Sequence, residues 1–450
     1  GSVSATTVWD VRSTATAGDV NGGGFDLATG SCATNWSLQD AAHIGYTDLV
    51  IGAVTTTYTS VLNSPTTGDV RCNVVHIVSG AGCTAGWYLV TSVAAGVATV
   101  SGAMGTASST CVANLGGALV TIHQGSTNAI SGNVVYVKGS FTITGTVTVD
   151  SNKLQFFIRG YGTTQGDSGT ATITTSTNSA RGFDITNAGA GPLGLSNFIM
   201  TNTAGGAKGV AIISTLGSTY SIVNVRIDGW GGGVHASAAT TPRAYFSGVE
   251  IKNSTSHGIV SFVGIMQGGN YIHNNGGSGI VMIGTNPELY INGSILSSNT
   301  VNGVLNTGTG GRLYISRSVL ANNSGDGINA SSATAQYYEN NIIYGNTGQG
   351  IDSTIVITNT FARLNAYGSN SGGNFTNYPA SSDDITLTGD PFTSSTNFAL
   401  NNTAGAGALL RATGFPGVFP GGTTTGFIDV GPVQTAGAAP SATIGVPSGQ

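Results

Sequence analysis

The middle of the chain repeats a short motif at a nearly constant interval. A glycine followed by an aliphatic residue recurs in steps of 24, 25, 21, 24, 24 and 23 residues, at Gly209-Val210, Gly233-Val234, Gly258-Ile259, Gly279-Ile280, Gly303-Val304, Gly327-Ile328 and Gly350-Ile351. A second aliphatic position lies seven or eight residues before each motif but the first, at Ile227, Ile251, Ile272, Leu296, Leu320 and Ile343. A third short apolar run precedes that position, as in Leu289–Ile291 and Leu313–Ile315. A fixed period of this length predicts a solenoid.

Three short β runs in each period favour an all-β fold, the right-handed parallel β-helix, over other solenoids. A leucine-rich repeat needs an LxxLxL pattern, which is absent, and propeller blades need about 40 residues or more. In a β-helix each strand pairs with its equivalent one coil away, at roughly 4.8 Å. The aliphatic positions are therefore expected to form two stacked columns that face inward.

The composition suits such a fold. The chain has 71 glycines but only 7% charged residues, which favours turns and strands over helices. A polar column repeats with the same period at Ser254, Asn275, Asn299, Asn323 and Asn346. We expect these side chains to hydrogen-bond along a ladder at a turn, where asparagine also tolerates left-handed backbone geometry.

Four regions are predicted along the chain. Residues 1–130 are expected to form an N-terminal cap with an inserted small β unit, and residues 131–378 the parallel β-helix. Residues 379–430 are expected to form a C-terminal cap, and the Ala/Pro/Gly/Ser-rich residues 431–450 a tail or strap. Caps are expected because the first and last coils would otherwise expose open strand edges.

All four cysteines lie in the first quarter of the chain, at Cys32, Cys72, Cys83 and Cys111. They include no CxxC pair and have no histidine at metal-ligand spacing, which argues against zinc. An even number in one region predicts two disulfides that staple the inserted unit, in an oxidising compartment. All three pairings stay open, and four buried thiols are the alternative.

Charged residues cluster on the middle strand of the predicted coils. Neighbouring coils place Arg226 beside Glu250 and Asp228 beside Lys252, and the next coil and the strand end add Tyr271, His273 and Trp230. One interpretation is a set of cross-strand ion pairs, each worth about 0.2–1 kcal/mol. The other is a glycan site with Trp230 and His273 as contacts and Asp228 and Glu250 as catalytic carboxylates. Strand geometry allows roughly 8 Å between these two acids, but the cationic neighbours would lower their pKa values.

Tyrosines recur at equivalent positions and form a predicted stripe. Tyr245, Tyr290, Tyr314 and Tyr337 share one column, with Met266 in the coil that lacks a tyrosine. Because their neighbours are aliphatic and should face inward, the rings should face outward and stack along the axis. The stripe is then either a ladder that blunts this face or packs on a neighbouring subunit, or a platform for sugar rings.

Several classes of partner find no support in the sequence. The net charge of −5 gives no electrostatic reason to expect nucleic acid. No apolar stretch approaches the 18 or so residues of a membrane span, and no GxxxxGK[ST] phosphate loop occurs. No cofactor is expected. Calcium at Asp383-Asp384 is an alternative to a solvated turn, without a supporting motif.

Three stretches carry a resemblance to known proteins. The repeating Asn…Gly-Ile coils across residues 200–360 resemble the right-handed parallel β-helix repeat family, the pectate-lyase-like superfold. The ending resembles the closing motif of secreted and viral β-helices, with Asp390-Pro391-Phe392, Asn397-Phe398-Ala399-Leu400, Gly405 and Gly426-Phe427-Ile428-Asp429-Val430-Gly431. The opening resembles predicted phage and environmental-virus β-helix surface proteins, with Val8-Trp9-Asp10-Val11-Arg12 and Asn21-Gly22-Gly23-Gly24-Phe25.

The resemblance implies the fold strongly and the function weakly, since the superfold hosts lyases, hydrolases, tailspikes and adhesins. It implies an exterior structural or receptor- and glycan-contacting protein of a phage virion, such as a fibre, tailspike or capsid-surface component. Its partners would be copies of itself, as a trimer or array, and surface polysaccharide or other virion proteins, outside the cell. The alternatives are a secreted polysaccharide lyase or glycoside hydrolase and a bacterial surface adhesin. Pectate lyases bind calcium through an acidic cluster and use an arginine as base, whereas acids are few here.

Overall fold

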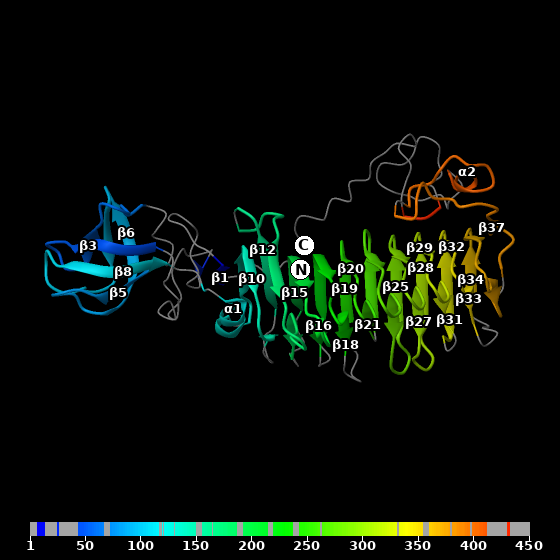
Figure 1. Ribbon diagram of the computed structural model, residues 1–450, viewed down its shortest axis with the longest axis horizontal. Coiled ribbons are helices and arrows are strands. Elements are labelled where there is room, and N and C mark those ends of the chain that lie inside the picture. The colour runs from blue at the N-terminus through cyan, green and yellow to red at the C-terminus, as the bar shows by residue number, and fades with distance from the viewer. Residues whose placement is uncertain are drawn as a thin grey trace.

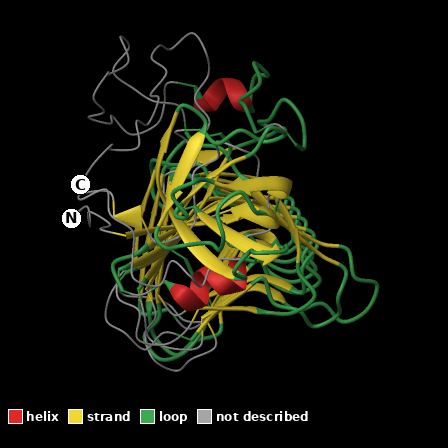
Figure 2. Cartoon of the chain, turned by 90° about the vertical axis from the view of Figure 1, so that its left-hand side faces the viewer, coloured by secondary structure: helices red, strands yellow, loops and turns green. Residues whose placement is uncertain are grey.

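The computed structural model describes residues 7–13, 25–26, 44–66, 73–116, 119, 121–129, 131–149, 155–163, 165–186, 192–214, 219–236, 243–261, 263–330, 333–353, 360–378, 380–396, 398–411 and 430–432. Within these ranges the chain is almost entirely β structure, arranged as a long rod with a small barrel beyond its N-terminal end (Figure 1). The described residues contain two short helices, α1 (Ile122–Asn128) and α2 (Gly407–Leu410) (Figure 2).

The rod consists of coils with three strand faces, and every strand on a face pairs in parallel with its neighbours one coil away. The first face holds β1 (Thr7–Arg12), β9 (Val134–Lys138), β12 (Phe156–Tyr161), β19 (Arg243–Ser247), β22 (Val263–Gln267), β25 (Glu288–Asn292), β28 (Arg312–Ser316), β31 (Ala335–Glu339) and β34 (Thr360–Arg363). The second face holds β10 (Ser140–Thr142), β13 (Ala171–Thr175), β20 (Glu250–Lys252), β23 (Tyr271–His273), β26 (Ile295–Ser297), β29 (Val319–Ala321), β32 (Ile342–Tyr344), β35 (Ala366–Gly368) and β37 (Ile385–Thr386).

Two long strands, β15 (Leu193–Asn202) and β17 (Tyr220–Asp228), run through both of these faces. The third face is a ten-stranded sheet of β11 (Val147–Val149), β14 (Phe183–Ile185), β16 (Val210–Ser214), β18 (Gly232–Ala236), β21 (Ile259–Ser261), β24 (Ile280–Met282), β27 (Val304–Asn306), β30 (Ile328–Asn329), β33 (Gln349–Asp352) and β36 (Gly373–Thr376). The predicted parallel β-helix is therefore confirmed.

The two predicted aliphatic columns form the core of the rod. The column from Ile227 to Ile343 pairs residue by residue through five coil steps, and all six side chains are fully buried. The second column holds from Val234 to Ile351. Its expected first member is wrong, because Val210 pairs with Gly232, and Ile212 takes the place over Val234. The run Gly231-Gly232-Gly233 supplies no side chain from which this register could be read.

The asparagine ladder is confirmed and continues to Asn370. Each amide oxygen accepts the backbone N–H of the equivalent residue one coil earlier, at 3.0–3.2 Å, as Asn323 does from Asn299. The left-handed backbone lies one position earlier than expected, for example at Asn274 and Asn322 with φ of 55° and 57°. The ladder residues themselves therefore use their side chains and not their backbone to shape the turn.

A second polar ladder runs parallel to the first at the corner between the first and second faces. It joins Asn270, Ser294, Ser318, Asn341 and Asn365 by hydrogen bonds from coil to coil and ends on Asp384, whose carboxylate accepts the Asn365 N–H at 2.9 Å. This ladder was not predicted, because serine takes the place of asparagine in two of its coils. Its period of 23 or 24 residues was the available signal.

The segment expected to cap the N-terminal end contributes directly to the rod. β1 pairs in parallel with β9, and Trp9 and Val11 are buried in the rod core. β2 (Phe25–Asp26) pairs antiparallel with β1, and α1 contacts β1, β9 and β11. The first coil of the rod thus begins more than a hundred residues before the predicted boundary, and the inserted unit interrupts it.

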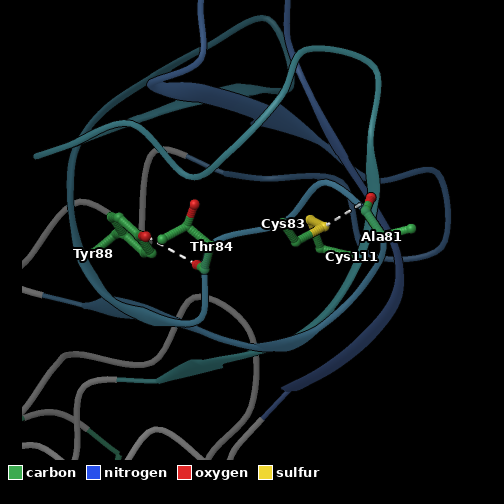
Figure 3. The surroundings of a disulfide bond; sticks show 5 residues. All are labelled: Ala81, Cys83, Thr84, Tyr88 and Cys111. Carbon is green, nitrogen blue, oxygen red and sulfur yellow. Dashed lines mark hydrogen bonds between the residues drawn. A yellow bond between two sulfur atoms is a disulfide. The ribbon is translucent and has the colours of Figure 1, made fainter.

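The inserted unit is an antiparallel barrel with a hydrophobic core of its own. It consists of β3 (Ile44–Ile51), β4 (Thr57–Thr59), β5 (Val74–Ser79), β6 (Gly86–Ala94), β7 (Val97–Val100) and β8 (Thr110–Gly116). One predicted disulfide is confirmed, between Cys83 and Cys111 (Figure 3). Cys32 and Cys72 lie outside the described residues.

The C-terminal segment folds back along the side of the rod. Residues 390–396 and 398–411, here called the lateral segment, lie over the second face (Figure 1). Phe392, Phe398, Leu400 and Leu410 bury the outward apolar side chains of three coils, which are Val319, Ala321, Ile342, Tyr344 and Ala366. No described helix is long and apolar enough to cross a bilayer.

Candidate functional site

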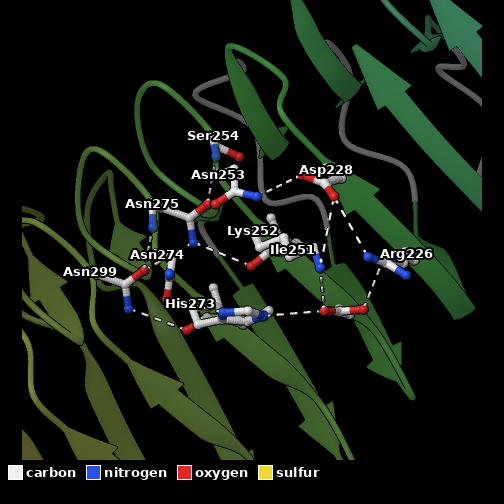
Figure 4. Close-up of polar contacts among 12 residues, drawn as sticks. Arg226, Asp228, Ile251, Lys252, Asn253, Ser254, His273, Asn274, Asn275 and Asn299 are labelled. Atoms are coloured by element: carbon white, nitrogen blue, oxygen red, sulfur yellow. Dashed lines mark hydrogen bonds and ion pairs between the residues drawn. The ribbon is translucent and has the colours of Figure 1, made fainter. Parts of the chain in front are cut away.

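The charged residues of the second face form one connected network, here called the charged patch, of Arg226, Asp228, Glu250, Lys252 and His273 (Figure 4). The Arg226 guanidinium lies 3.2 Å from the Glu250 carboxylate, and Lys252 Nζ lies 3.3 Å from it on the other side. Arg226 and Lys252 also approach Asp228, at 3.7 and 3.8 Å. The expected cross-coil pairs are present, and each cation bridges both acids.

The environment of Glu250 keeps its carboxylate ionised. Partial burial alone would raise the pKa of Glu250, but hydrogen bonds from His273 and Lys252 and the charges of Lys252 and Arg226 hold it below the ordinary glutamate value. The His273 Nε2–Glu250 contact is 3.2 Å, and the His273 ring stacks on Tyr271 at 3.7 Å. A carboxylate held ionised in this way is unsuited to donate a proton as a general acid.

Trp230 does not belong to this surface, and its expected placement is corrected. Its side chain is fully buried in the rod core. The strand ends at Asp228, and the following Gly229 has a φ of 75°, which breaks the alternation of faces from which the outward placement was inferred. The patch therefore offers charges to solvent without an indole ring, and its Tyr271–His273 stack is largely covered, because Tyr271 packs against Phe398.

The tyrosine stripe lies on the first face, with one correction. Tyr290, Tyr314 and Tyr337 pair in register, and Phe361 extends the column by one coil. The coil between Tyr245 and Tyr290 contributes Ile265, not Met266, which faces the core. The corner between β22 and β23 contains three residues, Gly268–Asn270, whereas the same corner in the neighbouring coils contains two. An alignment of the coils that assumes a corner of two residues therefore places Met266 in the position that Ile265 occupies.

Stacking within the column decides which parts of the rings are accessible. The Tyr290 and Tyr314 ring centroids lie 4.6 Å apart with planes 3° apart, and Tyr314 and Tyr337 lie 4.7 Å apart at 13°. Each ring of this column therefore covers a face of the next, and edges and hydroxyls are left toward solvent. Phe361 is tilted by 33° at 6.1 Å and is 46% exposed. A sugar ring would meet phenol edges along most of the column and a free aromatic face only near its end.

A groove of about 510 Å³ runs beside these rings. Its lining comes from five coils, and the wall opposite the aromatic column is the polar column of Gln267, Asn292, Ser316 and Glu339, which covers four of them. Burial, the charge of Glu288 and a hydrogen bond to that carboxylate raise the pKa of Tyr290, so its phenol stays protonated. An elongated groove with aromatic and amide walls is the arrangement expected for a ligand rich in hydroxyls.

The described residues contain no cluster of three potential metal ligands. Asp384 is used within the fold, because its carboxylate accepts the N–H groups of Asn365 and Ser381 at 2.9 Å. Asp383 lies 3.9 Å from Arg363. Both side chains of the pair thus have contacts within the fold.

Comparisons with known proteins show no family for this chain. The sequence matches no protein-family model and no curated protein. The A-module of the mannuronan C-5 epimerase AlgE4 of Azotobacter vinelandii is 12% identical, with 59% of this chain and 74% of that one covered and a TM-score of 0.41. Pectate lyase Pel9A is 15% identical, with 71% of this chain and 92% of that one covered and a TM-score of 0.43. The Dettilon tailspike protein gp208 is 14% identical, with 59% of this chain and 61% of that one covered and a TM-score of 0.35.

Proposed function

We propose that this chain is an extracellular, glycan-contacting rod that holds an extended polysaccharide along the aromatic groove of its first face. The observation that carries the proposal is the stacked column Tyr290, Tyr314 and Tyr337 beside a polar wall across four coils. Tyrosine suits a binding surface because it supplies area and a hydroxyl at low conformational cost. The coil spacing repeats these groups at a fixed interval, which fits a ligand that itself repeats.

A binding assay on the full chain tests this proposal. Polysaccharides and their oligomers would be titrated against the protein, and the tightest ligand measured with Tyr314→Ala and Tyr314→Phe. Removal of the central ring opens both stacks and should weaken binding about tenfold or more, as at a binding hot spot. Tyr314→Phe keeps the stacks and should lose less.

Leu409→Ala is the matched surface control, since Leu409 is exposed on the lateral segment, away from the groove. The Leu409→Ala protein should bind the polysaccharide with the same affinity as the wild type. Absence of binding to every polysaccharide, or full affinity of Tyr314→Ala, would reject the groove as a glycan site.

The charged patch is the place where the alternative, a lyase or hydrolase, would have its catalytic residues. Our proposal gives Asp228 and Glu250 a structural role, because two cations bridge them and Glu250 is held ionised. An enzyme would release reducing ends or unsaturated uronates from a polysaccharide, and Glu250→Gln would abolish that release. Release of such products that depends on Glu250 would reject the proposal of a binding protein and support an enzyme.

We also propose that the rod works on the exterior of a phage particle as a homo-oligomer, a trimer or an array. This rests on the resemblance of the opening and closing segments to viral β-helix proteins. Sedimentation velocity of the purified chain should give an oligomer over a wide range of concentrations. A monomer at every concentration would reject the proposed homo-oligomer. The glycan-binding proposal does not depend on this result.

A further inference from the structure

The lining of the groove contains a carboxylate but no cationic side chain among the described residues. Among the described residues that line it, Glu339 alone has a charged side chain. The nearby cations face carboxylates: Arg312 pairs with Glu288 at 3.3 Å, Arg363 lies 3.9 Å from Asp383, and the charge of Arg317 interacts with that of Glu339. These three cations and three carboxylates balance, so the surroundings of the groove offer no excess positive charge, and the whole chain carries −5.

An acidic polysaccharide would meet two obstacles in this groove. Each carboxylate that leaves water needs a charge-assisted donor, for which arginine or lysine is the usual partner. The lining offers phenols, amides and a serine hydroxyl instead, and Glu339 would repel a uronate. A neutral sugar has no such cost, because its hydroxyls both donate to carboxylate and amide oxygens and accept from phenols and amides.

We propose that the groove selects neutral, hydroxyl-rich glycan chains over uronate polymers, with Glu339 accepting hydrogen bonds from sugar hydroxyls; this inference rests on the proposed glycan-binding function. The phenol edges of Tyr290, Tyr314 and Tyr337 serve the same purpose, since they offer a hydroxyl in each of three successive coils. The selection comes from the absence of a cation in the described lining together with the presence of one acid.

Matched polymer pairs test the charge alone. Several acidic polysaccharides would each be compared with their own carboxyl-reduced form, which keeps linkages and length, beside a panel of naturally neutral polymers. Binding to the full chain would be measured at low and at high salt. We expect the neutral member of each bound pair to bind at least about tenfold tighter. Its affinity should be nearly independent of salt, because no ligand charge is available to screen.

Two variants assign the selectivity to the groove. Glu339→Gln should weaken the neutral ligand severalfold, and Glu339→Arg should bring the acidic member of a pair to equal or tighter binding. Asp352→Arg makes the same change of charge on β33 of the third face and should leave the preference unchanged. Equal effects of Glu339→Arg and Asp352→Arg would attribute the preference to overall charge and overturn the assignment.

The outcomes separate the two proposals. Tighter binding of the acidic parent polymers, weakened by salt and lost in Tyr314→Ala, would overturn the neutral preference and keep the groove as a glycan site. Failure of every polymer to bind would reject the glycan-binding function itself, and the preference with it.

Discussion

Single asparagines connect neighbouring coils of the rod. The Asn299 side chain donates from Nδ2 to the Ile272 carbonyl oxygen at 3.2 Å and to Asn323 Oδ1 at 3.0 Å. Its own Oδ1 accepts the backbone N–H of Asn275 at 3.2 Å. All of these groups are buried, and removal of this amide would take a hydrogen bond from the Asn275 N–H and from the Ile272 carbonyl oxygen, whereas Asn323 Oδ1 keeps the Asn299 backbone N–H. A buried polar group left unpaired costs about 1–3 kcal/mol.

Asn299→Ala should therefore destabilise the central coils by about 2–4 kcal/mol, as the sum of two or more unpaired groups. Hydrogen exchange of amides in β23, β26 and β29 measures the loss locally, which suits a rod whose coils contact only their neighbours. Thr300 is the next residue and is exposed, so Thr300→Ala should change the free energy of opening of these strands by less than about 0.5 kcal/mol. Equal protection in both variants would contradict the role of the ladder.

A histidine on the third face makes stability depend on pH. Burial, more than the nearby charge of His257, lowers the pKa of His235 to about 4. The unfolded chain takes up this proton near pH 6.5, so the native state loses stability as pH falls from about 6.5 to 4. The loss should reach up to about 3 kcal/mol, since one pKa unit corresponds to about 1.4 kcal/mol.

Chemical denaturation between pH 7 and 4 measures this effect. His235→Gln should flatten the dependence over that window, whereas His76→Gln, which lies in the separate barrel, should keep the rod's dependence. The prediction fails if the His235→Gln protein shows the same slope as the wild type.

At the scale of elements, the lateral segment covers apolar residues that an isolated coil would expose. α2 offers a matched pair of adjacent leucines, because Leu410 is fully buried against the second face and Leu409 is 42% exposed. Leu410→Ala should lower the free energy of opening of the lateral segment by about 2–4 kcal/mol, and Leu409→Ala by less than about 0.5 kcal/mol.

Hydrogen exchange of residues 390–411 measures this difference, with the strands of the third face as an internal reference. Those strands should exchange alike in both variants. Faster exchange throughout the rod in the Leu410→Ala protein would mean that the lateral segment is part of the coil fold and not an added cover.

The sequence predicted elements well where each coil has a fixed length, and less well where a corner changes. The column from Ile251 through Ile272 to Leu296 could be predicted because its side chains alternate with outward ones in every strand. Met266 was misplaced because the corner residues Gly268 and Gly269 carry no side-chain pattern that reveals an extra position. The turn after Asp228 hid the burial of Trp230 for the same reason: a left-handed glycine resets which face the next residue takes.

At the scale of the whole molecule, the rod and the barrel have separate hydrophobic cores. The disulfide Cys83–Cys111 closes a loop of 28 residues within the barrel, which on chain-entropy grounds stabilises it by about 3–4 kcal/mol. A Cys83→Ser/Cys111→Ser protein should therefore lose protection in β3–β8 while the third face of the rod keeps its wild-type exchange. Addition of a reductant to the wild-type protein should likewise lower protection in the barrel. Loss of rod protection would show that the two cores unfold together.

Long-range placement was the part of the molecule that the repeat could not predict. The expected caps were inferred from the need to close the ends of the solenoid. The chain instead places Trp9 and Val11 in the first coil and Phe398 over the side of later ones. Such contacts join residues far apart in sequence without a period, so they depend on complementary apolar surfaces that only the folded coils create.

The column Tyr290, Tyr314 and Tyr337 has an optical consequence. Three phenol chromophores, each less than 5 Å from the next and with nearly parallel planes, couple their electronic transitions. The folded rod should therefore carry a tyrosine signal in near-ultraviolet circular dichroism that exceeds that of isolated rings, and that signal reports the distance from coil to coil. Stretching or loosening of the rod would be visible in unlabelled protein as a fading of this band.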